Sequence, residues 1–248
     1  MKIITIFTII LSFSYGLTGL ELIDLMLQQK RPSDSRIDLI MRLTNKKGKT
    51  RESYLRSFSK NDGSKQIIWF LKPASDKGIA FLKIEHDDKP DQMQMWLPAF
   101  KRVKRISAGK RSDSFMGSDM SYEDMSNRQK NEFDYDILGT EHFKNNNCYI
   151  LESKPKNDLK TEYSKHVTWV DSSLMIPLKE ISYDKLGKLL KEKYYSYSII
   201  DNYQILTKVK VINIPSKHST EIQFRNITLN NNFNNNIFHE KALKRIPN

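Results

Sequence analysis

The sequence predicts a mainly β protein, an antiparallel meander curled into a barrel or half-barrel. Three observations lead to this fold class. Apolar and polar residues alternate in about a dozen short runs, which is the pattern of half-buried strands. Turns that contain glycine, such as Asn45–Gly48 and Lys60–Gly63, join successive runs as in hairpins. A series of short strands at this spacing is typical of a barrel or a related curved sheet.

Each strand follows from the alternation of its own residues. In the first strand Ile37, Leu39 and Met41 share one face, while Arg36 and Asp38 occupy the other. The later runs repeat this pattern between turn signals. The expected strands are Arg36–Leu43, Thr50–Ser59, Gln66–Leu71, Gly78–Ile84, Gln92–Leu97, Tyr135–Thr140, Cys148–Ser153, His166–Val170, Pro177–Tyr183, Leu189–Ser198, Thr207–Ile212 and Thr220–Leu229.

Two segments do not alternate. Thr18 and Glu21 form a capping box ahead of apolar residues at helical spacing, so an amphipathic helix is expected to end before Pro32. The segment Ser112–Asn131 carries bulky apolar residues among small and acidic ones, which indicates a loop or broken helix. Because a large exposed apolar patch is rare on a curved sheet that binds nothing, these two segments are the candidate covers of its concave face.

The start of the chain indicates export. Lys2 precedes an apolar run over Ile3–Phe13, and Ser14–Gly16 has the small-x-small pattern of a signal-peptidase site. The run is too short for a bilayer-spanning helix. We therefore expect a signal peptide over residues 1–16 and one domain over residues 17–248. The only cysteine is Cys148, so neither a disulfide within the chain nor an N-terminal lipid anchor is expected.

Six basic residues gather between the fifth expected strand and the segment Ser112–Asn131, in a chain of formal net charge +12. Lys101, Arg102, Lys104 and Arg105 are the candidate contacts to anionic headgroups or to a membrane partner. The alternative is a solvated strand face. Nucleic acid is disfavoured, because the chain is exported and no aromatic residue interleaves with the cluster as in a stacking platform.

Carboxylates in the segment Ser112–Asn131 could suggest chemistry. Asp113, Asp119, Glu123 and Asp124 match neither a calcium loop nor a zinc pattern, and there is no nucleophile elbow. We therefore expect no catalytic residue, no metal and no cofactor.

The apolar residues of this segment are better interpreted as a lid. Phe115, Met116 and Met120 are bulky, and methionine adapts to irregular partners such as acyl chains. The alternative is that they are core residues of a filled barrel. The tentative set of cavity and lid residues is Trp69, Phe81, Met93, Met95, Leu97, Phe115, Met116, Met120 and Trp169. Both faces of several strands are apolar, so alternation leaves open which face lines the cavity.

Four segments carry a family resemblance: WLPAFKRVKRIS, SFMGSDMSYEDM, IPLKEISYDKLGKLLKE and NNNIFHEKALKR. From about Leu17 to Arg245 the chain resembles the outer-membrane lipoprotein-sorting proteins, the LolA-like periplasmic carriers. The resemblance implies an unclosed antiparallel β-barrel of about eleven strands, with helices and a loop as a lid over a hydrophobic cavity. It implies no catalytic residues.

The function expected from this resemblance is a monomeric periplasmic carrier that binds acyl chains of lipoproteins or lipids. It would move them towards the outer membrane, with an inner-membrane transporter and an outer-membrane acceptor as partners. A lipid-sensing periplasmic regulator on the same fold stays open as an alternative. An envelope enzyme is the less favoured third hypothesis.

Overall fold

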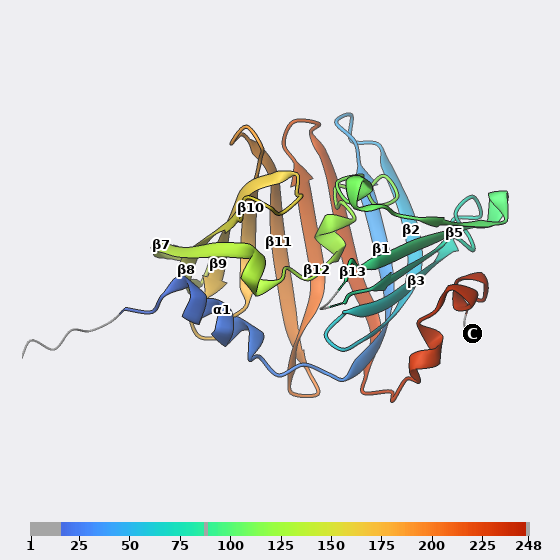
Figure 1. The fold of residues 1–248 in the computed structure, drawn as a ribbon, viewed down its shortest axis with the longest axis horizontal. Helices are drawn as coiled ribbons and strands as arrows, with labels where there is room; N and C mark the ends of the chain where they lie inside the picture. Colours follow the sequence, from blue (N-terminus) through green and yellow to red (C-terminus); the bar gives the residue numbers. More distant parts are fainter. Residues whose placement is uncertain (1–15, 87–88, 247–248) are drawn as a thin grey trace, which may run out of the picture.

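A computed structural model describes residues 16–86 and 89–246. The predicted signal peptide lies outside these residues except for Gly16. One antiparallel sheet of thirteen strands dominates the described chain (Figure 1). Its strands are β1 Asp34–Thr44, β2 Thr50–Lys60, β3 Lys65–Lys72, β4 Ala80–Ile84, β5 Gln92–Leu97, β6 Arg102–Arg105, β7 Phe133–Phe143, β8 Asn146–Pro155, β9 Tyr163–Asp171, β10 Pro177–Asp184, β11 Leu189–Ile200, β12 Tyr203–Asn213 and β13 His218–Leu229.

The sheet is not closed. Its order is β6-β5-β4-β3-β2-β1-β13-β12-β11-β10-β9-β8-β7, so β6 and β7 are its two edges. The chain runs outward from β1 to β6, crosses to the far edge, and returns from β7 to β13, which pairs with β1. The predicted fold class, an unclosed half-barrel, is confirmed. We call residues 106–132, which join the two edges, the crossing segment.

Helix α1, Gly19–Leu27, begins at the predicted capping box. The Thr18 hydroxyl accepts a hydrogen bond from the Glu21 N–H at 3.2 Å, and the Glu21 carboxylate accepts one from the Thr18 N–H at 2.8 Å. The helix packs on the β7 edge so closely that a Cβ on Gly19 would lie 2.5 Å from the Tyr135 carbonyl oxygen. Glycine at this position therefore fixes where the helix sits. The described chain has no other α-helix, only short 3-10 turns.

The 3-10 turns lie between β5 and β6, in the crossing segment, and in the C-terminal segment that follows β13. They are η1 Pro98–Phe100, η2 Ala108–Lys110, η3 Glu123–Met125, η4 Lys130–Glu132, η5 Asn235–Ile237 and η6 Glu240–Lys244. The crossing segment and α1 lie on the concave face (Figure 1). On the convex face, Phe238 and Leu243 from the C-terminal segment cover β2 to β4 at Phe58, Trp69 and Leu82. Among the described residues, no helix is long and apolar enough to cross a membrane.

Strand β6 is one strand more than the alternation predicted. Arg102, Lys104 and Arg105 are exposed, and only Val103 is partly buried, in the cluster on the convex face, so no alternation signals the strand. Its register is set by pairing with β5, from Leu97 opposite Arg102 to Gln94 opposite Arg105. A short, highly charged strand is a usual way to protect a sheet edge from pairing with other chains.

Candidate functional site

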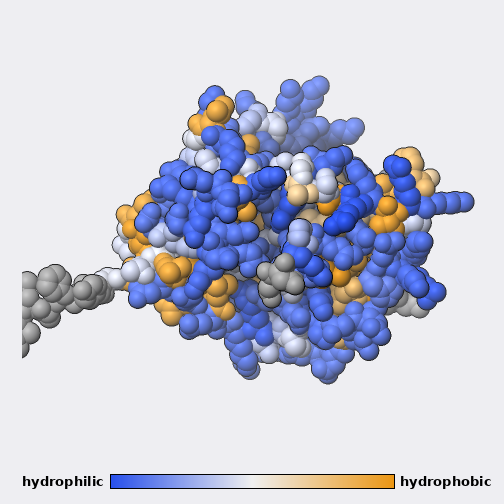
Figure 2. All heavy atoms as spheres, viewed as in Figure 1, coloured by the Kyte–Doolittle hydropathy of each residue, from blue (hydrophilic) through white to orange (hydrophobic). Residues whose placement is uncertain are grey.

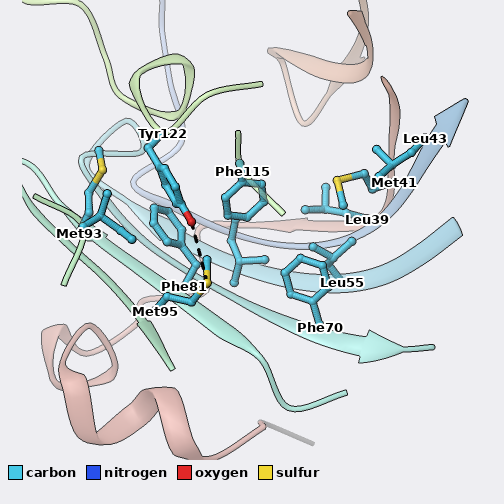
Figure 3. Close-up of a cluster of buried hydrophobic side chains, with 12 residues drawn as sticks. Leu39, Met41, Leu43, Leu55, Phe70, Phe81, Met93, Met95, Phe115 and Tyr122 are labelled. Atoms are coloured by element: carbon cyan, nitrogen blue, oxygen red, sulfur yellow. Dashed lines mark hydrogen bonds between the residues drawn. The ribbon is translucent and has the colours of Figure 1, made fainter. Parts of the chain in front are cut away.

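The concave face has two halves of different character. We call the side formed by β1 to β6 the filled half and the side formed by β7 to β12 the hollow half. In the filled half, residues of the crossing segment pack directly on the sheet (Figure 3). The buried members of this cluster are Leu39, Met41, Leu43, Leu55, Ile68, Phe70, Phe81, Met93, Met95, Ile106, Phe115 and Tyr122.

Phe115 lies at the centre of the filled half. Its ring centroid is 5.2 Å from that of Phe81, 6.2 Å from Phe70 and 5.9 Å from Tyr122. Tyr122 in turn directs its hydroxyl at the Met95 sulfur, 3.9 Å away (Figure 3). Phe115 is 3 % exposed. These contacts are those of core side chains, because aromatic rings at such distances fill the space between strand and crossing segment.

Six of the nine predicted cavity and lid residues therefore gather on one side. Phe81, Met93, Met95 and Phe115 are buried in the filled half, and Leu97 and Met116 pack at its margin. Met120 is half-buried in the same crossing segment, where its carbonyl accepts a hydrogen bond from the Phe115 N–H.

Trp69 and Trp169 require a correction, since both lie on the convex face. Ile68 pairs with Phe81, so Trp69 points the other way and donates its ring N–H to the Ala242 carbonyl at 3.3 Å. Trp169 shares a convex cluster with Ile150, and the Lys179 ammonium lies 4.3 Å from its ring. The expectation that Trp69 and Phe81 line one wall is wrong. Phe81 is paired with Ile68, and residues opposite each other share a face, so Trp69, the next residue after Ile68, lies on the other face from Phe81.

Lys101, Arg102, Lys104 and Arg105 lie together at the β6 edge. All four side chains are exposed, and none makes an ion pair with a described residue. Phe100, directly before them, is 67 % exposed, and the Arg102 guanidinium lies 5.4 Å from its ring. The edge therefore presents an uncompensated positive charge next to an exposed aromatic ring.

The hollow half contains a cavity of about 420 Å³ between α1, the crossing segment and the sheet. This volume falls in the range of small-molecule sites, roughly 300–1,000 Å³. One wall is apolar, and the opposite wall is polar. The apolar lining includes Ile23, Met26, Leu27, Phe133, Tyr135, Leu151, Met175, Ile176 and Pro177; the polar lining includes Asp124, Arg128, Thr168, Glu180, Lys193, Tyr195, Tyr197 and Gln204.

Helix α1 forms much of the apolar wall. Leu22 is fully buried against Leu151 and Val170, which fixes the helix on β8 and β9. Ile23 and Met26 lie one turn apart and face the cavity, while Leu20 and Leu27 are about half exposed. Figure 2 shows apolar atoms gathered over α1 on an otherwise mostly hydrophilic face. The helix therefore covers the cavity while exposing apolar surface of its own.

The polar wall is built around buried ion pairs. The Asp124 carboxylate accepts from the Lys193 ammonium at 2.5 Å and from the Lys191 ammonium at 3.0 Å. Lys193 also contacts Glu180 at 3.2 Å, and Arg128 binds Glu180 through both terminal nitrogens, at 2.6 and 2.9 Å. With Glu162 on Lys191, three carboxylates balance three cations. This charge network ties the crossing segment to β10 and β11.

The pKa values show why these groups stay charged. Burial acts to raise the pKa of Asp124, but Lys193 and Lys191 outweigh it and hold that pKa well below its usual range. Burial likewise opposes ionisation of Glu180, and Arg128 and Lys193 hold its pKa well below normal. A buried pair that lost one partner would leave an uncompensated charge, which is strongly destabilising. The network is therefore a structural brace for the crossing segment.

His166 and Ser182 lie against this network in an arrangement that resembles a nucleophile and its base. The His166 Nδ1 is 2.8 Å from the Ser182 hydroxyl and 3.2 Å from an Arg128 nitrogen. Both residues are sealed, at 1 % and 0 % exposure, and burial with the Arg128 charge lowers the pKa of His166 well below normal. A substrate could not reach Ser182, so the pair has a structural role. No group of three or more potential metal ligands occurs among residues 16–86 and 89–246.

The conspicuous motif SFMGSDMSYEDM divides its contacts between the two halves. Phe115 and Tyr122 pack into the filled half, whereas Asp124 joins the charge network of the hollow half. Asp119 accepts hydrogen bonds from Thr220 at 2.7 Å and lies 2.7 Å from His218, both on β13. The motif thus anchors the crossing segment along its path, which explains its mixture of aromatic and acidic residues.

The sequence does not predict most of the residues that line the cavity. It identifies Ile23, Met26 and Leu27 only as apolar residues of a helix, and it does not single out Lys193 and Glu180. One signal existed. One face of β11 carries Lys191, Lys193, Tyr195 and Tyr197 in alternation. Lysines on the buried face of a strand need buried carboxylates as partners, so this pattern indicates a charged site on the concave face.

Comparisons with known proteins agree with the architecture. A family model described as "Uncharacterized protein" matches residues 62–245, and no curated protein matches the chain. An outer membrane lipoprotein-sorting protein domain from Vibrio parahaemolyticus is 30% identical with a TM-score of 0.85, over 92% of this chain and 98% of its own. A DUF1329 family protein from Desulfovibrio piger is also 30% identical with a TM-score of 0.85, over 91% of this chain and 97% of its own.

A more distant structure shows the fold alone. A LolA superfamily protein from Nitrosomonas europaea is 17% identical with a TM-score of 0.73, and the match covers 92% of this chain and 100% of that protein. Together with the half-barrel, α1 and the crossing segment on its concave face, the first two matches assign the family. The chain belongs to the outer membrane lipoprotein-sorting protein family.

Proposed function

We propose that this protein is a periplasmic carrier that binds acyl chains of lipoproteins or lipids in the cavity of the hollow half. The observation that carries the proposal is a cavity of about 420 Å³ with an apolar wall from α1, β8 and the β9–β10 turn. The lipoprotein-sorting domain to which the chain is 30% identical supports the same class of ligand. Transfer towards the outer membrane, with an inner-membrane transporter and an outer-membrane acceptor, is part of the proposal.

The expected energetics suit a carrier. Burying a chain of roughly 16 carbons at about 0.8 kcal/mol per CH₂ would yield on the order of 10 kcal/mol before ordering costs. Any movement of α1 that admits the chain exposes apolar surface and subtracts from this gain. The resulting affinity would be moderate, which allows release at the destination.

Helix α1 is the cover with the weaker polar attachment, although Leu22 and Gly19 hold it on the sheet. Its one ion pair to the crossing segment joins Asp24 and Lys130 at 2.6 Å, and both side chains are about two-fifths exposed. Exposed pairs of this kind contribute about 0–1 kcal/mol. The crossing segment, in contrast, is fastened by the Phe115 cluster and the buried charge network. We therefore assign ligand entry to the α1 side.

The β6 edge is the proposed contact to membranes. Lys101, Arg102, Lys104 and Arg105 have no described carboxylate partners, and each basic residue near an anionic leaflet contributes about 1 kcal/mol. Phe100 could insert at the interface, where aromatic side chains are favoured. The edge lies at the opposite end of the sheet order from β7, so membrane contact and ligand binding are separable by mutation.

The test is native mass spectrometry of the protein purified from its own cell envelope. We expect a co-purified lipid or acylated peptide, and its loss in the variant Met26→Trp, which fills the cavity from α1. Leu20→Trp is the matched control on the exposed side of the same helix and should keep the ligand. A wild-type protein without ligand, including after incubation with lipid vesicles, would contradict the proposal. Retention of ligand together with a stable complex with a signalling membrane protein, and no transfer between vesicles, would instead indicate a regulator.

A further inference from the structure

Four tyrosines line the cavity, and the hydroxyls of three of them, Tyr135, Tyr195 and Tyr197, make no hydrogen bond with a described residue. Tyr195 and Tyr197 follow each other on the concave face of β11, whereas Tyr135, on β7, packs on the apolar side of the cavity with Leu151. Residues two apart on a strand share a face and are separated by roughly 7 Å. Tyr195 is next to the charge network at Glu180 and Arg128, and Tyr197 lies towards Arg31. The two hydroxyls therefore mark successive levels of the cavity, from its buried end towards its exposed end.

These hydroxyls lack protein partners. No described residue makes a hydrogen bond with the side chain of Tyr135, Tyr195 or Tyr197, and all three residues are partly buried at the cavity. Tyr163, the fourth tyrosine of the lining, donates to Asp124 at 2.9 Å, and Tyr194, on the other face of β11, donates to Glu192 at 2.7 Å. The hydroxyls of Tyr135, Tyr195 and Tyr197 are thus free to bind a ligand in the cavity.

The three hydroxyls are also fixed as donors. Burial raises the pKa of Tyr195 and Tyr197 above the ordinary value and that of Tyr135 to about 12. A protonated phenol near neutral pH can donate one hydrogen bond to an acceptor in the cavity. Opposite Tyr195 and Tyr197, Ile23 and Met26 of α1 offer only apolar surface. The cavity is therefore shaped for a molecule with an apolar chain along one side and a hydrogen-bond acceptor along the other.

We propose that Tyr195 and Tyr197 bind the ester or amide carbonyls at the base of the acyl chains. The ligand is then an acylated amphiphile, and a plain hydrocarbon chain is a poorer ligand. Its polar end points towards Lys30 and Arg31, which line the exposed end of the cavity. This inference rests on the proposed carrier function. It adds that the carrier recognises the carbonyl groups of its ligand through hydrogen bonds.

The physical basis is the cost of leaving the hydroxyls unpaired. A ligand without an acceptor displaces the water that would otherwise solvate them and offers nothing in exchange. A site built to hydrogen-bond its ligand therefore discriminates against analogues that lack the group. One neutral hydrogen bond corresponds to about a fivefold difference in affinity.

A matched pair of ligands tests the inference. 1-Palmitoylglycerol and 1-O-hexadecylglycerol have the same chain length, and only the former, an ester, carries the carbonyl that the latter, an ether, lacks. Titration calorimetry on delipidated full-length mature protein should show the ester bound about fivefold more tightly. In the variant Tyr195→Phe/Tyr197→Phe this preference should fall to about one, while binding of the ether changes little. The same assay with a dipalmitoylated cysteine peptide distinguishes a lipoprotein source from a glycerolipid source. If the ligand is a lipoprotein, the affinity for this peptide should depend more on Tyr195 and Tyr197 than the affinity for 1-palmitoylglycerol does.

The control is Tyr194→Phe, the same substitution on the opposite face of β11, which should keep the ester preference. Thermal unfolding of each variant confirms that it is folded. Equal binding of ester and ether to the wild type, or a preference that survives in the double variant, would overturn the inference and leave the carrier function intact. Failure of both amphiphiles to bind the wild type would overturn the proposed function and this inference with it.

Discussion

The two halves of the concave face use the same sheet and differ in what covers it. Over β1 to β6 the crossing segment inserts Phe115 and Tyr122 into the sheet and fills the space above it. Over β7 to β12 the same segment is tied to β10 and β11 by ion pairs of Asp124 and Arg128, and α1 supplies the remaining cover. The concave face is therefore filled where the crossing segment inserts aromatic rings, and it contains a cavity where that segment is held by charged side chains.

The largest expected effect breaks the filled half. Phe115→Ala removes a ring that is 3 % exposed, so we expect a loss of about 3–5 kcal/mol in the free energy of unfolding. Urea denaturation measures it. Phe100→Ala, at 67 % exposure, should cost less than about 0.5 kcal/mol. A Phe115→Ala variant of nearly wild-type stability, with reduced ligand binding, would show that Phe115 belongs to a lid and not to the core.

The next effect breaks the brace of the hollow half. Asp124→Asn leaves Lys191 and Lys193 each with one carboxylate fewer, and we expect about 3 kcal/mol of destabilisation in urea denaturation. Asp134→Asn, an exposed carboxylate on β7, should change stability by less than about 0.5 kcal/mol.

The pH dependence of stability provides an independent test of this brace. Because the pKa of Asp124 is lower in the folded than in the unfolded protein, its contribution is complete above the unfolded value of about 4 and is lost on further acidification. Stability should fall steeply below about pH 4, and less steeply in Asp124→Asn. Identical acid profiles for the two proteins would contradict the proposed role of the pair.

The smallest effect on stability comes from the β6 edge, outside both halves. Reversing Lys101, Arg102, Lys104 and Arg105 to glutamate should leave the free energy of unfolding within about 1 kcal/mol, because all four are exposed. Sedimentation with vesicles containing phosphatidylglycerol should show a loss of association of at least about tenfold at low salt, and little difference at high salt. If association with the vesicles at low salt is unchanged, these residues do not bind membranes and serve only to protect the sheet edge from pairing with other chains.

The strands were predictable because each is encoded locally. Twelve of the thirteen strands show alternation or an apolar run between turn signals, and the capping box at Thr18 indicates the start of α1. Strand β6 carries no such signal, since three of its four residues are basic and exposed. Its pairing depends on β5 and on the sheet edge, which alternation within one segment does not reveal.

The site was less predictable because it depends on contacts between distant segments. Alternation separates the two faces of a strand but does not say which face is concave, so the sequence predicts Trp69 and Trp169 in the cavity although they lie on the convex face. The path of the crossing segment decides which half is filled, and that path follows from pairing across the whole sheet. Asp124 meets Lys193 and Arg128 meets Glu180 only after the chain has returned along β7 to β11.

We place the acyl chain in the hollow half and not in the filled half. Photocrosslinking with a palmitoyl chain that carries a diazirine near its end, followed by mass spectrometry of the labelled peptides, locates the chain in the unaltered protein. We predict adducts on α1 at Ile23 and Met26 and on the sheet side at Leu151 and Met175. Adducts concentrated at Phe81, Met93, Met95 and Phe115 would contradict this placement, because they would put the acyl chain where the structure has a filled core.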